Sequence, residues 1–399
     1  MRQTYKQSLR SYVREHIKRI IFIILAAALL GIVTYWPQRA ITGMSADFYC
    51  AKIFPVVAFV FNSFSNFWMV SVSENLLVVI AIMAVILTVW FIISFIRLML
   101  TGKKQREYLT SVLKTVSWLL VVAIVLMTVY QLMHGINYNR TSVEEKLDLE
   151  ECTDYQDYVD TLNWAYAGML SARSKLGEDY LGVAHMKTSF EKCVYDANGT
   201  VNAVSDTYGL DMSPNYIRAK AVSLSNLWSY TDITGVYSVL LGEANVNTDY
   251  LDILEFPITL CHEISHAKGY AREYDCNMIA VLSCISSTRP DFRYAGYFYI
   301  FIHLYSDVAQ YAEALGMEFY DYLGDSRFAA VRRDMRAQDD YEASLEEGFI
   351  PDLISRFSED ANNAFLEANG QEGGTYTYHI HTNFYVDFFH KYIRTEDDA

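Results

Sequence analysis

Three apolar stretches without a charged residue occupy the first third of this 399-residue chain, at residues 20–36, 76–96 and 115–133. They contain 17, 21 and 19 residues, and a helix needs roughly 17–25 residues to cross the hydrocarbon core of a bilayer. The sequence therefore predicts three transmembrane helices at about these positions. They define a membrane region at residues 1–135 and leave residues 136–399 for a second domain.

Two segments near these stretches have alternative interpretations. The first stretch could be a cleaved signal peptide, but two further apolar stretches follow it and Thr34-Tyr-Trp-Pro is a poor cleavage site, which favours an uncleaved anchor. The segment at residues 54–70 is also apolar but is interrupted by Pro55, Asn62 and Asn66. We expect an interfacial or re-entrant helix there, and a buried loop is the alternative.

Lysine and arginine are distributed unevenly around the predicted spans. Six precede the first span and five lie between the second and third, whereas the loop after the first span has only Arg39 and Lys52. Because cytoplasmic loops carry the excess of basic residues, we expect the N-terminus to face the cytoplasm. With three spans, the domain at residues 136–399 is then extracytoplasmic, in a multi-pass protein of the cell membrane.

The predicted outer domain is acidic. It contains 19 basic and 43 acidic residues, a net charge of −24. Such a surface repels the phosphates of nucleic acid. We therefore expect no nucleic acid among the partners, and expect a peptide or protein substrate outside the cytoplasmic membrane in addition to the lipid bilayer itself.

The outer domain is predicted to be mainly helical with a small β element. Asn198-Gly199 reads as a turn, and two short runs rich in Val, Tyr and Leu read as strands. The expected helices lie at residues 142–176, 256–268, 272–286 and within 291–395, and the expected strands at 219–224 and 235–241. Gly269 suits the left-handed position after the helix at 256–268.

Six cysteines are present without a C-x-x-C pair. Cys152 and Cys193 both fall in the outer domain, where an oxidising compartment would allow a disulfide between them. Two unpaired thiols are the alternative, and the sequence does not decide between them.

The segment CHEISHAKGYAREYDCN, residues 261–277, contains the order H-E-x-x-H in His262, Glu263 and His266. On a helix, residues four apart share a face, so both imidazoles can bind one zinc ion. Glu263 then lies beside the ion as a general base for water that attacks a peptide carbonyl. The alternative is a pair of surface histidines without a metal.

A catalytic zinc usually has three protein ligands. The metzincin pattern requires a ligand six residues after His266, but that position is Arg272, which cannot bind a metal. The nearest downstream acids are Glu273 and Asp275. They point about 200° apart on a helix, so at most one of them reaches the ion.

The segment CHEISHAKGYAREYDCNMIAVLSC resembles the H-E-[IL]-A-H-x-x-G-[FY]-A-R-E-x-E-A-N segment of a bacterial membrane family catalogued as domain of unknown function 3810. Three further blocks are similar to that family: TGVYSVLLGEANVN at 234–247, FRYAGY at 292–297 and NAFLEANGQEGGTYTY at 363–378. The resemblance implies a zincin-like α+β domain related to H-E-x-x-H metallopeptidases. It also implies Asp275, which stands where the family has the Glu of E-A-N, as the third zinc ligand, with Glu273 as the alternate.

Substrate-binding residues are less strongly indicated. The stretch at 235–247 is a candidate edge strand that aligns a substrate backbone, and its Glu243, Asn245 and Asn247 either line the cleft or form a polar turn. Arg272 either pairs with Glu243 or Asp275 or is an ordinary surface charge. Tyr378 is a candidate donor to the oxyanion of the transition state.

These observations predict a membrane-anchored zinc-dependent metallopeptidase that hydrolyses peptide bonds with zinc-activated water. Zinc is held by His262, His266 and Asp275, or by Glu273 in its place, and Glu263 is the general base. The alternative is a non-catalytic membrane-anchored binding or scaffolding protein with a structural metal site. Glu263 favours the enzyme, because a structural site has no use for that carboxylate.

Overall fold

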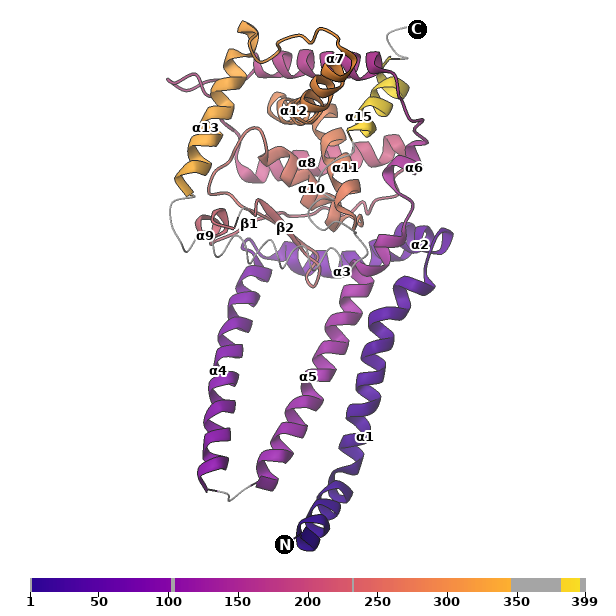
Figure 1. Ribbon diagram of the computed structural model, residues 1–399, viewed down its shortest axis with the longest axis vertical. Helices are drawn as coiled ribbons and strands as arrows, with labels where there is room; N and C mark the ends of the chain where they lie inside the picture. Colours follow the sequence, from indigo (N-terminus) through magenta and orange to yellow (C-terminus); the bar gives the residue numbers. More distant parts are fainter. Residues whose placement is uncertain (1, 102–104, 232, 346–381, 395–399) are drawn as a thin grey trace.

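Each apolar stretch lies inside a long helix of the computed structural model (Figure 1), namely α1 (Arg2–Ala40), α4 (Val72–Thr101) and α5 (Gln105–Met133). A helix satisfies its backbone polar groups internally, which an apolar solvent requires. The side chains of α4 are largely exposed over its apolar centre. The structure describes residues 2–101, 105–231, 233–345 and 382–394.

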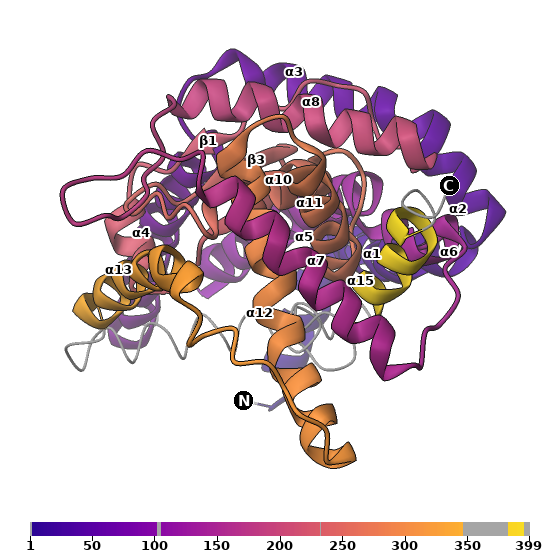
Figure 2. The same ribbon diagram turned by 90° about the horizontal axis from the view of Figure 1, so that it is seen from above.

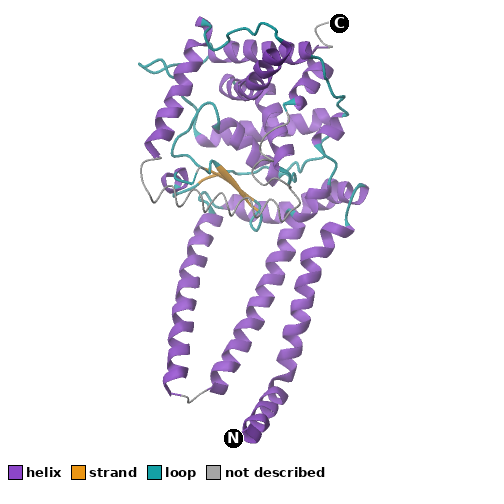
Figure 3. Cartoon of the chain, viewed as in Figure 1, coloured by secondary structure: helices purple, strands orange, loops and turns teal. Residues whose placement is uncertain are grey.

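A fourth apolar segment connects α1 to α4. It comprises α2 (Met44–Phe48), the π-helical turn η1 (Tyr49–Ile53) and α3 (Phe54–Phe67). By length and composition, four helical segments could cross a membrane: the three long helices and Met44–Phe67. The expectation of a helix at residues 54–70 is confirmed, and the alternative of a loop is wrong. Figure 3 shows α3 running transverse to the long helices, beneath the remaining domain.

Above α3 lies a domain made mainly of helices. The segments are η2 (Gly135–Asn139), α6 (Val143–Leu147), α7 (Tyr155–Arg173), α8 (Phe190–Tyr208), β1 (Lys220–Ala221), α9 (Ser225–Ser229), β2 (Gly235–Ser238), β3 (Glu243–Val246), α10 (Phe256–Ala267), α11 (Glu273–Ser286), α12 (Pro290–Leu315), η3 (Ser326–Phe328), α13 (Ala329–Leu345), α15 (Asn383–Phe388) and η5 (Phe389–Ile393). The prediction of a mainly helical domain with a small β element is confirmed.

The three short strands form one sheet in the order β1-β3-β2. Strand β3 pairs in parallel with β1 and antiparallel with β2. Strand β3, Glu243–Val246, is therefore the central strand, and all four of its residues are buried. The sequence predicted either the end of an edge strand or a polar turn at these residues. The run predicted at 219–224 shortens to the two residues of β1.

The core surrounds α10 and α11. Figure 2 shows both helices between α8 and α7, and α10 packs on α11, α8 and α12. The interior is rich in aromatic side chains, including the fully buried Phe292, Tyr294 and Phe301. The helix that carries H-E-x-x-H is thus an interior element whose position is fixed on several sides.

Two local expectations have different outcomes. The helix predicted at 256–268 is confirmed as α10, and Gly269 after it has a φ of +110°. The turn predicted at Asn198-Gly199 is wrong, because α8 runs through both residues. The Asn198 side chain instead forms hydrogen bonds with the backbone of Ile217 while its backbone stays in the helix.

All six cysteines are free thiols, so Cys152 and Cys193 do not form a disulfide.

Candidate metal centre

Helix α10 brings His262 and His266 together on one face. Pro257 at the start of the helix supplies a preformed helical φ, and Gly269 ends it. The two histidines are 8% and 5% exposed, and their Nε2 atoms lie 3.0 Å apart. Both rings therefore direct a nitrogen toward the same point, as the four-residue spacing predicts.

Glu273, the first residue of α11, completes this group. Its Oε2 lies 3.0 Å from Nε2 of His262 and 3.2 Å from Nε2 of His266. Tetrahedral zinc with ligands at about 2.0–2.1 Å places neighbouring ligand atoms roughly 3.3 Å apart. Two imidazole nitrogens and one carboxylate oxygen at these separations fit a zinc ion bound by three protein ligands.

The other nitrogen of each imidazole faces an acceptor. Nδ1 of His262 lies 2.7 Å from Oδ1 of Asn277, and Nδ1 of His266 lies 2.9 Å from the carbonyl oxygen of Tyr270. A carbonyl oxygen accepts only, so the proton of His266 belongs on Nδ1, and the Asn277 oxygen has the same effect on His262. Each Nε2 is then free to bind a cation, as is usual for metal-binding histidines.

Electrostatics keep Glu273 ionised. Burial acts to raise the pKa of this carboxyl, but His266 and the hydrogen bonds from both histidines outweigh burial and hold the pKa well below its usual range. Burial acts to lower the pKa of His266, but Cys276 and Glu273 outweigh burial and raise it well above its usual value. A divalent transition metal at this group would replace that proton and would meet one negative oxygen and two imidazole nitrogens, which is a suitable donor set.

Glu263 lies beside the three potential ligands without joining them. Its Oε2 is buried and, among the described residues, has no hydrogen-bond partner. Burial raises the pKa of this carboxyl to about 7, although His262 and His266 oppose the rise. A buried carboxylate oxygen is costly without a donor, so the arrangement fits a water molecule held between Glu263 and a metal.

Space for Glu263 comes from Gly235 on β2. A Cβ atom at Gly235 would lie 2.7 Å from Oε1 of Glu263 and 2.8 Å from Cγ2 of Thr259. No side chain larger than hydrogen fits there without displacing the glutamate. Strand β2, at the edge of the sheet, thus passes directly over the acid.

The structure does not bring Asp275, the preferred third ligand, into this group. Its Oδ1 accepts from the backbone N–H of Val143 at 2.8 Å, and its Oδ2 accepts from Nε of Arg272 at 2.8 Å. Both oxygens point away from the histidines because Asp275 lies about 200° around α11 from Glu273. The alternate, Glu273, is the acid whose oxygen lies beside both histidine nitrogens.

Arg272 forms contacts that join two segments of the fold. It pairs with Asp275, one of the two partners expected, and its Nη2 donates to the carbonyl oxygen of Arg140. It does not contact Glu243 in the described structure. Arg272 therefore connects α11 to the segment that leaves α5, and the structure does not bring it to the metal group.

The residues predicted to line a cleft on β3 are mostly engaged elsewhere. Glu243 accepts hydrogen bonds from the backbone of Val72 and Ser73 at the start of α4. Asn245 donates to Ser73 Oγ. Asn247 bonds with Ser229 and borders a cavity described below. Tyr378 lies outside the described residues.

Two residues near the group were not predicted. Asn277 orients His262, and the ring of Tyr237 on β2 stacks on that of His266 with centroids 5.9 Å apart. The Tyr237 hydroxyl is buried and, within the described chain, forms no hydrogen bond. Both residues stand in the blocks that carry the family resemblance, AREYDCN and TGVY, which was the available signal.

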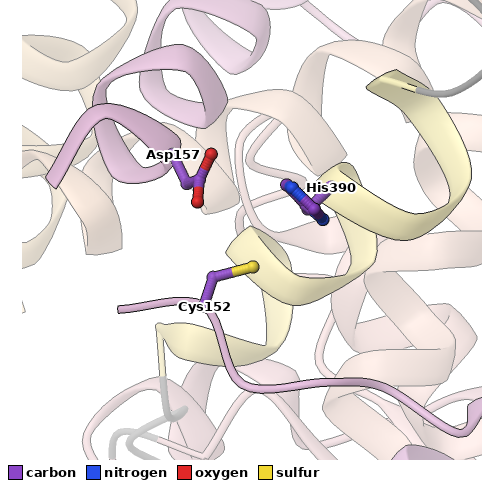
Figure 4. A group of neighbouring side chains, drawn as sticks. All are labelled: Cys152, Asp157 and His390. Carbon is purple, nitrogen blue, oxygen red and sulfur yellow. The ribbon is translucent and has the colours of Figure 1, made fainter. Parts of the chain in front are cut away.

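A second cluster could also offer three metal-binding atoms. Figure 4 shows Cys152, Asp157 and His390, whose ligand atoms lie within 4.8 Å of one another. Asp157 is already paired with Arg394 at 2.5 Å, and burial followed by the nearby Asp387 raises the pKa of the Cys152 thiol to about 12. A protonated thiol is a poor ligand, so this cluster is the weaker candidate.

Comparison with known proteins assigns the chain to a protein family. The model of a family described as "Protein of unknown function (DUF3810)" matches residues 49–386. No curated protein and no solved structure matches the chain. The match includes α10, α11 and β2, and therefore every residue of the metal group.

Proposed function

We propose that this chain, which belongs to the DUF3810 family, is a membrane-anchored zinc-dependent metallopeptidase. The observation that carries the proposal is the convergence of His262, His266 and Glu273, whose three ligand atoms lie 3.0–3.2 Å apart. Beside them Glu263 supplies a buried carboxylate with a free oxygen. Two imidazoles, one carboxylate and an adjacent base are the donor set of catalytic zinc sites.

The residues would divide the work as follows. His262, His266 and Glu273 would hold zinc, which when bound supplies Lewis acidity that lowers the pKa of water toward about 7. Glu263 would accept the proton as the water oxygen attacks the peptide carbonyl, and would deliver it to the leaving amine. Asn277 and the Tyr270 carbonyl would fix the ring orientations throughout.

Strand β2 supports a peptide substrate. It is the outer strand of the sheet, next to β3 alone among the described strands, and Gly235 passes over Glu263. An extended peptide added to the free edge of β2 would satisfy its unpaired backbone groups. Its carbonyl groups would then run past the proposed base.

We further propose that α1, α4 and α5 cross the cell membrane with the N-terminus in the cytoplasm, so that the catalytic domain lies outside. This rests on the apolar length of the three helices and on the basic residues at their N-terminal and loop ends. The substrate would be a peptide or protein on the outer side of the membrane.

The test uses the full-length protein in detergent, because α3 and α4 contact the domain directly. We expect about one zinc per chain by elemental analysis, and cleavage of casein peptides by mass spectrometry. Glu263→Gln should retain zinc and lose cleavage, whereas Glu273→Gln should lose most of the zinc. Asp275→Asn is the matched control, because Asp275 lies two residues from the proposed ligand Glu273 but faces away, and it should retain the metal.

The experiment also tests the alternative of a structural metal in a binding protein, which the burial of all three potential ligands favours. In that case zinc is present, but neither the parent nor any variant cleaves peptides. Absence of zinc from the purified parent after zinc addition would contradict both functions.

A further inference from the structure

A cavity lies next to the proposed catalytic group, between the start of α10, the loop after β3 and helix α13. It is a partly open hollow whose empty space, open solvent included, amounts to about 600 Å³. Thr259 of α10 borders it, one helical turn before Glu263, and its hydroxyl contacts that of Thr234 at 3.4 Å. Four residues of helix correspond to roughly 6 Å, so the cavity opens about one turn from the proposed base.

The charge of this cavity is negative. Its described lining includes Asp252, Glu255 and Glu342, and no lysine, arginine or histidine occurs among those lining residues. Acidic residues gather on many protein surfaces without a ligand, so their presence alone does not define a site. The position of one of them is more specific.

Asp252 is buried, with only 7% of the residue exposed. Its Oδ1 accepts from the backbone N–H of Leu254 at 3.1 Å. Its Oδ2 is buried without a hydrogen-bond partner in the part of the chain that the structure describes. Burial raises the pKa of this carboxyl to about 7, with smaller contributions from nearby acids. Buried carboxylate oxygens normally accept a hydrogen bond. The Oδ2 atom of Asp252 lacks the donor for one among the described residues.

The walls of the cavity fit a long side chain. The rings of Tyr250 and Tyr341 stack with centroids 4.3 Å apart and an interplanar angle of 13°, and Phe256 adds a third aromatic ring to the lining. Lysine and arginine combine an aliphatic stem, which packs on such surfaces, with a cationic end group. Aromatic rings also attract cations directly.

We propose that this cavity binds the lysine or arginine side chain of a polypeptide. The cation would lie near Asp252, with Glu255 and Glu342 adding to the attraction, and the stem would pack on the aromatic wall. One consequence, and only this one, rests on the proposed peptidase function: the enzyme cleaves peptide bonds near a basic residue. The same cavity would bind basic peptides even without cleavage.

The test compares synthetic peptides that differ at one position, which is Lys, Arg, norleucine or Glu. Full-length protein in detergent is assayed in two ways: cleavage by the parent, and fluorescence anisotropy of peptide binding to Glu263→Gln. We expect the Lys and Arg peptides to be favoured over norleucine by at least about tenfold in both assays, as for a charge-assisted hydrogen bond. Asp252→Asn and Glu342→Gln should each reduce that ratio to less than about threefold.

Glu318→Gln, an exposed charge outside the cavity lining, is the control and should leave the ratio unchanged. Cleavage without a preference for basic residues overturns the inference while the peptidase stands. Absence of cleavage together with Lys-selective binding that Asp252→Asn removes supports the cavity and contradicts the peptidase. Equal binding of the Lys and norleucine peptides overturns the inference in either case.

Discussion

At the scale of single residues, the proposed catalytic group depends on contacts that leave little room for change. Glu263 is confined between α10 and β2, and Gly235 is the residue that makes the space. His262 and His266 are held by Asn277 and the Tyr270 carbonyl, respectively. Small displacements of such groups slow catalysis strongly, since a shift of about 1 Å can lower the rate by a factor of roughly 100.

Gly235→Ala should separate the base from the metal ligands. The three atoms nearest to the new methyl group belong to Glu263 and Thr259 and none to the potential metal ligands, so we expect a loss of cleavage of about 100-fold with unchanged zinc content. Elemental analysis and peptide cleavage measure the two effects. Gly199→Ala is the control, because a Cβ there meets nothing within 4 Å. Unchanged cleavage in Gly235→Ala would contradict the role of Glu263.

Asp252 predicts a pH-dependent stability. Its folded pKa of about 7 lies above the ordinary aspartate value of 3.8, so its contribution to stability is full below about pH 4 and is lost as the pH rises through 7. Asp252→Asn removes this loss. The variant should therefore melt at a higher temperature than the parent at pH 8, and at a similar temperature at pH 4.5. A lower melting temperature at pH 8 would contradict the buried, unpaired state of Asp252.

At the metal group, the sequence predicts the positions of some side chains and not of others. The proximity of His262 and His266 follows from helix geometry alone, and in the structure the two ring centroids lie 4.7 Å apart. The choice between Glu273 and Asp275 does not follow, because it depends on which face of α11 the turn at 268–272 presents to α10. The family resemblance favoured Asp275, whereas Val143 and Arg272 hold that carboxylate away.

At the scale of elements, buried charged residues join the central strand to the long apolar helix α4. Glu243 of β3 accepts from the N-terminus of α4, where the helix dipole favours a negative group. Lys220 of β1 lies 3.9 Å from the same carboxylate. In return, Glu74 of α4 accepts from the backbone of Ser223 and Leu224. These contacts fix the sheet, and with it β2, relative to α4.

Glu243→Gln should therefore weaken the fold and spare the metal. Both Glu243 and Lys220 are almost fully buried, at 0% and 1% exposure, and removing one partner of such a pair costs about 3 kcal/mol. We expect a clearly lower melting temperature in detergent and one zinc per folded chain, with Glu318→Gln as an exposed control. Loss of zinc at temperatures where the variant remains folded would instead place Glu243 in the site.

Elements with a strong periodic or apolar pattern were predictable, and those set by distant contacts were not. The long helices and α10 follow from composition, helix geometry and the position of Gly269. Strand β3 is four residues long and becomes a strand by pairing with β1 and β2. Helix α8 passes through Asn198-Gly199 because the Asn198 side chain bonds with Ile217, 19 residues away, which no local signal reveals.

At the scale of the whole molecule, the position of α3 decides how many times the chain can cross a membrane. Helix α3 touches the domain at both of its ends: Asn215 donates to the carbonyl oxygen of Pro55, and Asn66 donates to that of Tyr216. A helix held at both ends by one domain lies along that domain, as Figure 1 shows. Although Met44–Phe67 is long and apolar enough to cross, these contacts favour three crossings.

Three crossings and four crossings predict opposite results for labelling of intact cells. With three, the N-terminal end of α1 and the domain lie on opposite sides of the membrane; with four, they lie on the same side. Arg14 and Tyr180 are both exposed, Tyr180 at 93%, so Arg14→Cys and Tyr180→Cys can report the two ends. A membrane-impermeant maleimide should label Tyr180→Cys in intact cells and Arg14→Cys only after lysis.

The parent chain provides the background for this labelling, because five of its six cysteines are buried and Cys152 is half-buried. The same behaviour of the two variants in intact cells, whether both are labelled or both are protected, would mean that Met44–Phe67 crosses as well. Labelling of Arg14→Cys alone would place the domain in the cytoplasm. Because the metal group lies in the domain, that second outcome would restrict the substrates of the proposed peptidase to cytoplasmic proteins, and the basic-residue cavity would have to be tested with them.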